Sequence, residues 1–233
     1  DNKVLAGDGP GSFFANITGL TPGTTYYTRA YAIRNNNDIY YGNEQSFTTL
    51  TLGMPTPGVG MVYDIDGNAY NTITLGTQVW MVENLKTTSY RDGTPIPNIT
   101  DNTAWASAAS GAYCNYNNDP SNAAVYGRLY NSYAVKDAKI VAPLGWHVPT
   151  FSEWSTLARF LGGRDVAGGR MKEAGLSHWL SPNTGADNSS GFTVVGSGIR
   201  AYHNGAFGWQ NAQSSMWTST DVGDHFVLTN TSA

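Results

Sequence analysis

His147 and Glu153 are the residues whose types and spacing could carry general acid–base chemistry; both lie in the stretch LGWHVPTFSEW. Glu153, however, follows Thr150 in the pattern of a capping box. In this motif the threonine oxygen accepts from the amide of the glutamate, and the carboxylate accepts from the amide of the threonine. His147 has no second histidine or carboxylate at metal-ligand spacing. The stretch therefore predicts a structural helix start, with His147 packed or hydrogen-bonded rather than catalytic.

The residues after Glu153 predict an amphipathic helix. Trp154, Leu157, Ala158 and Leu161 recur at i, i+3, i+4 and i+7, on one face of a 3.6-residue repeat. Glycines at 162–163 then supply a helix stop. We expect this face to pack into the core, so that the stretch forms a wall of the fold.

A second polar group, Asp64, Asp66 and Asn68, could be read as a calcium loop. It lacks the EF-hand spacing and the distal bidentate glutamate of that motif. Asp66-Gly67 is instead a favoured dipeptide of two-residue hairpin turns, and a second turn signal follows at 76–77. We therefore predict a β-meander without a metal.

Cys114 is the single cysteine, so these residues allow neither an internal disulfide nor a thiolate metal cluster. No Ser/His/Asp arrangement, nucleophile elbow, phosphate loop or histidine-rich metal spacing occurs elsewhere in the sequence. The sequence predicts no catalytic residue, no metal and no cofactor.

The composition favours an extracellular, loop-rich β protein. Only 13% of the 233 residues are charged, 12% are aromatic, and there are 27 glycines and 14 tyrosines. The net charge is −4 and the 13 Lys and Arg are scattered, which disfavours nucleic acid and anionic membranes as partners. No apolar run reaches the length of a membrane span. The first residues do not resemble a signal peptide, so we expect the numbering to begin inside a longer precursor.

Two domains and a linker are predicted. Residues 12–50 alternate apolar and polar positions around two turn signals, which indicates three strands of an antiparallel sandwich in a first domain, 1–50. Residues 51–61 hold prolines and glycines and are predicted to form a short, semi-rigid linker. The second domain covers residues 62–233.

The run LTPGTTY, which ends at Tyr26, resembles the corner of fibronectin type III domains, where a tyrosine hydroxyl ties back to the backbone. The resemblance implies an immunoglobulin-like β-sandwich and a structural role for Tyr26. Such a sandwich needs about 100 residues, so only its C-terminal half is present here. We expect the missing strands upstream of Asp1; the alternative is a neighbouring chain that completes the sheet by strand addition.

Most of the second domain carries a set of recognisable segments, which include DIDGNAYNTITLGTQVWMVENLKTTSYRDGTPIPNITDNTAW, GAYCNYNND, YGRLYNSYAV, GWHVPTFSEW and SGFTVVGSGIR. They resemble the Fibrobacter succinogenes major paralogous domain family of secreted and surface proteins. The resemblance implies an α+β, C-type-lectin-like fold with mixed, antiparallel-rich sheets and a few short helices. This fold is similar to that of formylglycine-generating enzymes, which use two cysteines for copper where this chain has only Cys114. The sugar-reading tripeptides of calcium-dependent lectins are absent.

The chain departs from the family pattern in places. It has VAPLGWH at 141–147 where members commonly carry CPxGWH, so the partner of Cys114 is absent or lies outside these residues. SMWTSTD at 215–221 replaces YWWSSTE, and no GFSVRC strand precedes Ala233. We therefore expect the second domain to lack its closing strand.

C-type-lectin-like folds bind ligands on late loops, which correspond here to residues 199–217 and 224–230. In this region aromatic residues alternate with amides and glycines, as in a paratope. The predicted ligand-binding residues are Arg200, Tyr202, His203, Asn204, Phe207, Trp209, Gln210, Asn211, Gln213 and His225. The alternative is an aromatic hairpin packed inward. Trp217 is assigned to the core.

The sequence thus favours a non-enzymatic, secreted or surface-anchored module that binds a glycan or a host or bacterial protein. One alternative is a structural subunit of a surface appendage or a phage-borne receptor-binding or decoration protein. A less favoured one is an enzyme related to sulfatase modifiers. Some proteins of this fold class are varied by diversity-generating retroelements, and Asn204, Asn211 and Asn230 would be candidate variable positions.

Overall fold

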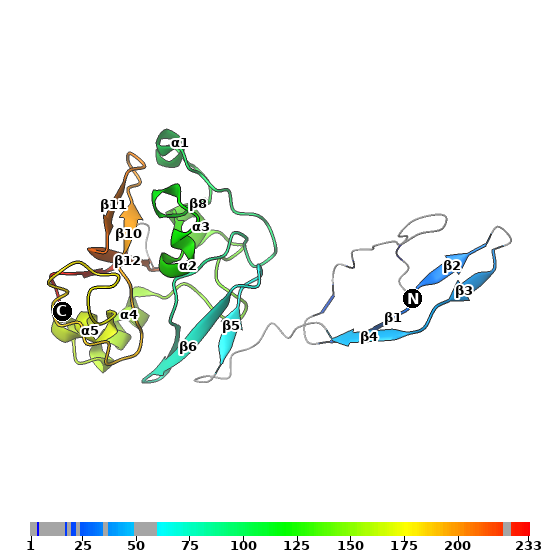
Figure 1. Cartoon of the computed structure of the whole chain (residues 1–233), viewed down its shortest axis with the longest axis horizontal. Helices are drawn as coiled ribbons and strands as arrows, with labels where there is room; N and C mark the ends of the chain where they lie inside the picture. The colour runs from blue at the N-terminus through cyan, green and yellow to red at the C-terminus, as the bar shows by residue number, and fades with distance from the viewer. Residues whose placement is uncertain are drawn as a thin grey trace. The chain divides into compact units, whose positions relative to one another are not determined.

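The structure is a computed structural model that describes residues 4, 17, 20–21, 24–34, 37–48, 60–220 and 225–233. The chain divides into two units, Asp1–Gly53 and Met54–Ala233; Figure 1 labels most of their elements. Most of the predicted linker, residues 51–59, lies outside the described residues.

The described part of the first unit is a pair of short antiparallel ribbons. Strand β1 (Thr25–Thr28) pairs with β4 (Gln45–Thr48), and β2 (Tyr31–Ile33) pairs with β3 (Ile39–Tyr41). The sequence predicts three strands, whereas four are present. The pairing register shifts by one residue between the two ribbons, as at a β-bulge. This shift separates β1 from β2 on one side of the hairpin and β3 from β4 on the other.

Tyr26 has the structural role that its motif predicts. Its hydroxyl accepts a hydrogen bond from the backbone amide of Thr21 at 2.8 Å. Its ring stacks on Phe47 with 6.0 Å between the centroids. Both interactions are internal to the unit, so the predicted tie from the Tyr26 hydroxyl to the backbone is confirmed, whereas the fibronectin-like sandwich stays a prediction.

The described residues of the second unit form small sheets joined by long loops. Strands β5 (Met61–Tyr63), β6 (Ala69–Leu75) and β7 (Gln78–Met81) make the predicted antiparallel meander, although its first loop spans residues 64–68 rather than two. Strand β8 (Tyr113–Cys114) pairs with β9 (Leu129–Tyr130). The last sheet has the order β11 (Phe207–Gln210), β10 (Ser197–Arg200), β12 (Gln213–Trp217) and β13 (His225–Thr229). In it, β10 and β12 are parallel and the other neighbours antiparallel.

Short helices complete the unit: α1 (Asn102–Ala106), the 3-10 turn η1 (Tyr116–Asn118), α2 (Asn122–Tyr126), α3 (Ser132–Lys136), α4 (Phe151–Phe160) and α5 (Arg164–Met171). Side-chain caps explain where several begin; Asp101 accepts from the amide of Ala104, and Asn131 from that of Ala134. The predicted α+β class, with antiparallel sheets and few helices, is confirmed. Among the described residues, no helix is long and apolar enough to cross a membrane.

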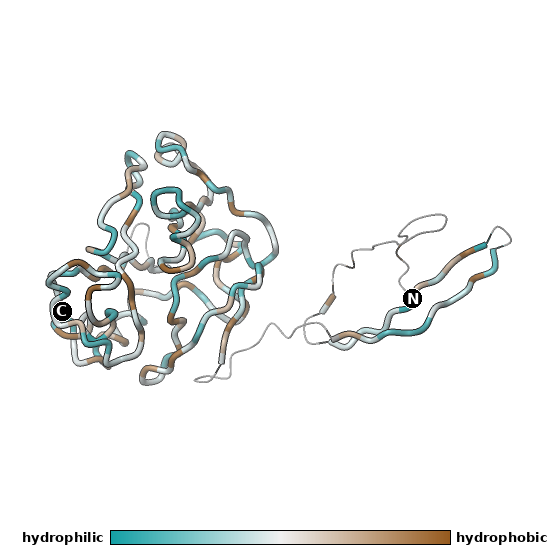
Figure 2. Tube along the Cα trace, viewed as in Figure 1, coloured by the Kyte–Doolittle hydropathy of each residue, from teal (hydrophilic) through white to brown (hydrophobic). Residues whose placement is uncertain are grey.

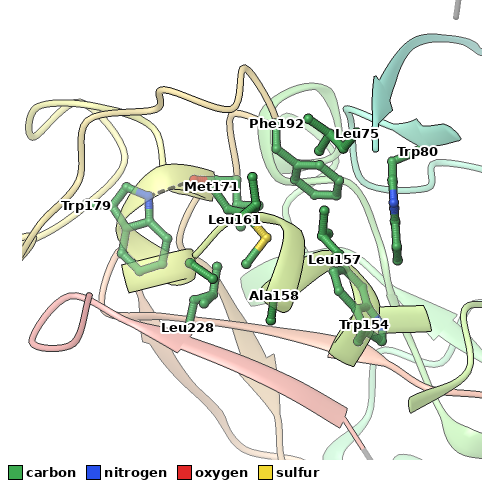
Figure 3. Packing of buried hydrophobic residues seen from close by; sticks show 12 residues of the cluster. Leu75, Trp80, Trp154, Leu157, Ala158, Leu161, Met171, Trp179, Phe192 and Leu228 are labelled. Carbon is green, nitrogen blue, oxygen red and sulfur yellow. Dashed lines mark hydrogen bonds between the residues drawn. The ribbon is translucent and has the colours of Figure 1, made fainter. Parts of the chain in front are cut away.

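The main core lies on the inner face of α4, as the helical spacing predicts. Trp154, Leu157, Ala158 and Leu161 are all buried, and Leu157 has no exposed surface. They pack against side chains from the meander, from α5 and from the late strands (Figure 3). The ring of Trp154 lies 4.5 Å from that of Trp80 and stacks on Phe226 at 5.0 Å. The buried residues of this core come from separate stretches of the chain, and Figure 2 shows the hydrophobic residues of the second unit as short brown segments along the tube.

Cationic side chains hold the long loops in place. Arg91 donates to the carbonyls of Ala142, Pro143 and Trp146, and Arg128 to that of Lys86. Lys172, fully buried, donates to the carbonyls of Thr184, Thr229 and Ser232. All of these carbonyls except that of Thr229 lie in loops, outside the regular bonding of a helix or a sheet ladder, and the charged donors supply hydrogen bonds to them.

Candidate functional site

The predicted ligand-binding residues lie at both ends of the last sheet. Those at the turn between β10 and β11 are Arg200, Tyr202, His203, Asn204 and Phe207. His225 lies at the same end, because its partner strand β12 runs parallel to β10. At the opposite end, where β11 turns into β12, are Gln210, Asn211 and Gln213, with Trp209 between the two groups. The structure thus brings together only part of the predicted set.

Arg200 is buried, with 8% of its surface exposed. Its guanidinium donates at 2.5 to 3.0 Å to the carbonyls of Ile99, Thr100 and Gly205 and to Oδ1 of Asn102. It also lies 4.6 Å from the ring centroids of both Trp105 and Phe207. Arg200 therefore fixes the hairpin to the segment around α1, and its burial makes it a positioning residue rather than a ligand contact.

The amides at the opposite end are used within the fold. The Gln210 amide donates to Asn122 Oδ1 at 3.4 Å, and the Gln213 amide donates to Ser215 Oγ at 2.7 Å. Asn211 Oδ1 accepts from the Tyr126 hydroxyl at 2.8 Å. Asn230 donates to the carbonyl of Ser181 at 3.0 Å. A replacement at 211 or 230 would lose such a bond. Asn204 also accepts a bond, from the amide of Ala206, but that bond is local to its turn, so of the three candidate variable positions Asn204 is the one with no long-range side-chain bond among the described residues.

The turn between β10 and β11 presents Tyr202 to solvent. Tyr202 is 84% exposed and meets the His203 ring edge-on at 5.4 Å. Asn204 Oδ1 accepts from the amide of Ala206 at 3.0 Å, which fixes the turn locally. Gly205 has a φ of +69°, and a Cβ there would lie 2.4 Å from the carbonyl oxygen of Asn102. Only glycine allows the turn to approach α1 this closely.

Trp209 is the second exposed aromatic of the hairpin, at 63%. Its φ is +66°. Gly198, which has a φ of +69°, lies opposite Trp209 on β10, between the regular pairs Ser197–Gln210 and Ile199–Gly208. In a regular strand Trp209 would share a face with Phe207, which packs on Tyr116 at 5.4 Å. The left-handed backbone takes the indole out of that alternation. A bulky residue in this conformation is uncommon and costs roughly 1–3 kcal/mol, and such strain often occurs at binding sites.

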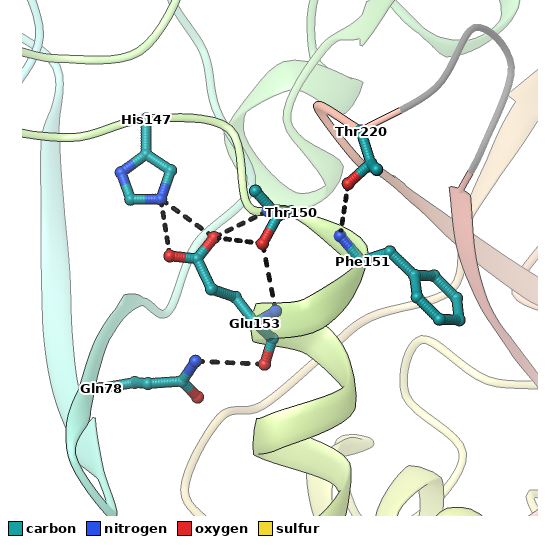
Figure 4. A network of polar contacts seen from close by, with 6 residues as sticks. All are labelled: Gln78, His147, Thr150, Phe151, Glu153 and Thr220. Carbon is teal, nitrogen blue, oxygen red and sulfur yellow. Dashed lines mark hydrogen bonds and ion pairs between the residues drawn. The ribbon is translucent and has the colours of Figure 1, made fainter.

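The pair suggested by the sequence, His147 and Glu153, forms a structural network (Figure 4). Glu153 accepts from the backbone amide of Thr150 at 2.7 Å, and Thr150 Oγ1 accepts from the amide of Glu153, which confirms the capping box. His147 Nε2 lies 2.9 Å from the same carboxylate. Burial raises the pKa of Glu153, but the hydrogen bonds from Thr150 and His147 outweigh it and leave the pKa below its ordinary value. The predicted hydrogen-bonded role of His147 is confirmed.

The other candidate reactive groups are also engaged in the fold. Asp64 Oδ1 accepts from the amides of Asp66 and Asn68 at 3.0 and 2.9 Å, as expected for a turn. Cys114 is completely buried, and burial raises the pKa of its thiol to about 11. Within the part of the chain that the structure describes, no three His, Cys, Asp or Glu side chains are grouped so that they could hold a metal ion.

A groove that the sequence reasoning did not identify lies on the outer side of α4. It has a volume of about 680 Å³ and is lined by residues that include Phe151, Ser152, Ser155, Arg159, Arg164 and Thr220. Ser152, Ser155 and Arg159 recur at i, i+3 and i+7, opposite the apolar face. This polar stripe could have been found from the sequence, whereas the contributions of Arg164 and Thr220 depend on the fold.

The fold and these sites define a mixed α+β domain with a hairpin that exposes aromatic side chains. The family model of the Fibrobacter succinogenes major domain matches residues 73–230, and the chain belongs to this family. The resemblance inferred from the sequence is thereby confirmed for this part of the chain. Searches among curated proteins and among solved structures gave no match.

Proposed function

We propose that the chain is a non-enzymatic binding module, secreted or anchored at a cell surface. Its second unit binds a glycan or protein ligand on the hairpin of β10 and β11. The observation that carries the proposal is the exposure of Tyr202 and Trp209 on one hairpin, at 84% and 63%. Large exposed aromatics are costly to leave in water and give a partner contact area at low entropic cost.

The backbone supports the same interpretation. Trp209 keeps a strained φ of +66° although little of the indole is buried in return. Packing alone gives no reason for a tryptophan at this position, whereas a ligand that stacks on the ring would. Arg200 holds the hairpin before a ligand arrives, which reduces the entropy lost on binding.

A non-enzymatic role is favoured because the candidate reactive groups are hydrogen-bonded within the fold or buried. The carboxylate of Glu153 caps α4 and binds His147, and the Cys114 thiol is buried with a raised pKa. A nucleophile needs an accessible, activated group. The C-type-lectin-like fold of the second unit, the fibronectin-like sandwich of the first and the extracellular location are parts of the same proposal, supported by family membership and by the Tyr26 corner.

The test is a screen of the intact chain against glycan arrays and surface proteins, beside a Tyr202→Ala/Trp209→Ala variant. A Tyr63→Ala/Tyr133→Ala variant is the matched control, because both tyrosines are 52% exposed and lie outside the hairpin. We expect a hit that the hairpin variant loses and the control keeps, with equal thermal unfolding of all three. A hit retained by the hairpin variant would reject the hairpin as the site.

The first unit supports a second candidate, a structural subunit completed by a neighbouring chain. Its described strands form only two-stranded ribbons, and Tyr27, Ile33 and Tyr40 are 69%, 56% and 52% exposed. Two-stranded ribbons are marginally stable alone, and strand addition would cover such side chains. Sedimentation velocity over a range of concentrations separates the candidates: polymers favour the subunit, and a monomer throughout favours the binding module.

A further inference from the structure

The arginines of the second unit fall into two groups. Those that donate to backbone carbonyls are Arg91, Arg128, Arg170 and Arg200. Within the described part of the chain, Arg159 instead donates only to Thr156 Oγ1 on its own helix, at 3.1 Å, and the guanidinium of Arg164 lies 5.8 Å from the ring centroid of Phe151. Both are exposed, and neither forms an ion pair with a carboxylate among the residues that the structure describes. Their charges are not required to hold a loop.

These two arginines line the same groove, on the outer side of α4. Among the described residues, no carboxylate belongs to its lining, and Glu153 is held by Thr150 and His147. The described lining thus carries two positive charges in a chain whose net charge is −4. Its volume of about 680 Å³ is within the usual range for small-molecule sites, which is roughly 300 to 1,000 Å³.

The remaining lining suits a sugar better than a bare anion. Phe151 is 46% exposed and offers a flat apolar face. The hydroxyls of Ser152 and Ser155 form no hydrogen bond within the described residues, and Thr220 Oγ1 accepts from the amide of Phe151 at 2.9 Å, which leaves its own hydrogen to donate. Charged donors, hydroxyls and one ring therefore face a common space.

We infer that this groove is a second binding site, for an anionic saccharide. The guanidinium groups of Arg159 and Arg164 bind the acidic substituent, a carboxylate or a sulfate, because the planar fork of arginine matches such oxyanions. The hydroxyls meet the sugar hydroxyls, and Phe151 stacks on the C–H face of the ring. The site is separate from the β10–β11 hairpin, so the inference does not depend on the hairpin function.

The experiment is an NMR or calorimetric titration of the full chain with three trisaccharides: a trigalacturonate, a sulfated galactotriose and neutral galactotriose. We expect the acidic sugars to bind and the neutral one to bind at least about tenfold more weakly. Comparison of the two acidic sugars identifies the substituent. Inorganic sulfate is titrated alone; if it binds as tightly as the acidic sugars, the saccharide assignment is wrong.

Variants locate the binding. Arg159→Gln/Arg164→Gln should weaken the acidic sugars by roughly tenfold or more, whereas Lys136→Gln/Lys139→Gln, which removes the same charge outside the groove, should not. Tyr202→Ala/Trp209→Ala should leave the titration unchanged, which separates this site from the hairpin. Equal loss in the lysine control, or no binding of either acidic sugar, would overturn the inference. Thermal unfolding verifies that each variant is folded.

Discussion

Helix α4 and the β10–β11 hairpin place the same residue types in opposite environments. In α4 the tryptophan, Trp154, is buried and the arginine, Arg159, is exposed. In the hairpin the arginine, Arg200, is 8% exposed and the tryptophan, Trp209, is 63% exposed. The usual preference for burial is reversed in the hairpin because carbonyl acceptors surround the guanidinium, while the backbone of Trp209 turns the indole outward. Burial here follows available partners as much as hydrophobicity.

The largest change in stability is expected at Leu157 in α4, the element in which burial follows the usual preference. Leu157→Ala removes a side chain with no exposed surface from the centre of the main core and leaves a cavity. We expect a loss of about 4 kcal/mol in the free energy of unfolding. Urea unfolding followed by tryptophan fluorescence measures it. A loss below about 1 kcal/mol would show that this face does not carry the core.

Arg200→Met tests the hairpin, in which the usual preference for burial is reversed. The variant keeps much of the apolar stem but leaves the carbonyls of Ile99, Thr100 and Gly205, of which only Gly205 belongs to a buried residue, without their charged donor. We expect the free energy of unfolding to fall by about 3 kcal/mol. Amide hydrogen exchange should show the turn and residues 99–105 loosened more than α4. If Arg200→Met is as stable as the parent, its burial is incidental.

The same comparison explains what could be predicted from the sequence. The roles of Thr150, Glu153 and Leu157 follow from neighbours within a few positions, because a capping box and a 3.6-residue repeat are local patterns. For the late strands the sequence predicts ten ligand-binding residues but does not indicate which of them are exposed. Arg200 bonds to Ile99, 101 positions away, and Asn211 to Tyr126, 85 positions away. No local pattern indicates which late side chains meet such distant partners, so exposed and buried members of the set were not distinguishable.

The polar start of α4 provides a smaller, pH-dependent test. The folded pKa of Glu153 lies below its unfolded value of about 4.5, so the carboxylate stabilises the fold above that pH, and this contribution is lost as the pH falls through the folded pKa. Glu153→Gln should cost less than about 1 kcal/mol at pH 7, because solvent screens a partly exposed pair. The difference between parent and variant should shrink toward pH 3 in thermal unfolding curves. A difference independent of pH would assign the effect to packing.

The smallest change in stability is expected at Trp209, and it has the most direct bearing on function. Trp209→Asn places a residue that tolerates the left-handed region at a φ of +66°. The relief of backbone strain should offset the lost contacts of a ring that is 63% exposed, so the free energy of unfolding should change by no more than about 0.5 kcal/mol. Binding to the hairpin ligand should nevertheless be lost. A clear destabilisation would mean that Trp209 serves the fold as Trp154 does, and the strained backbone would then no longer support a binding role.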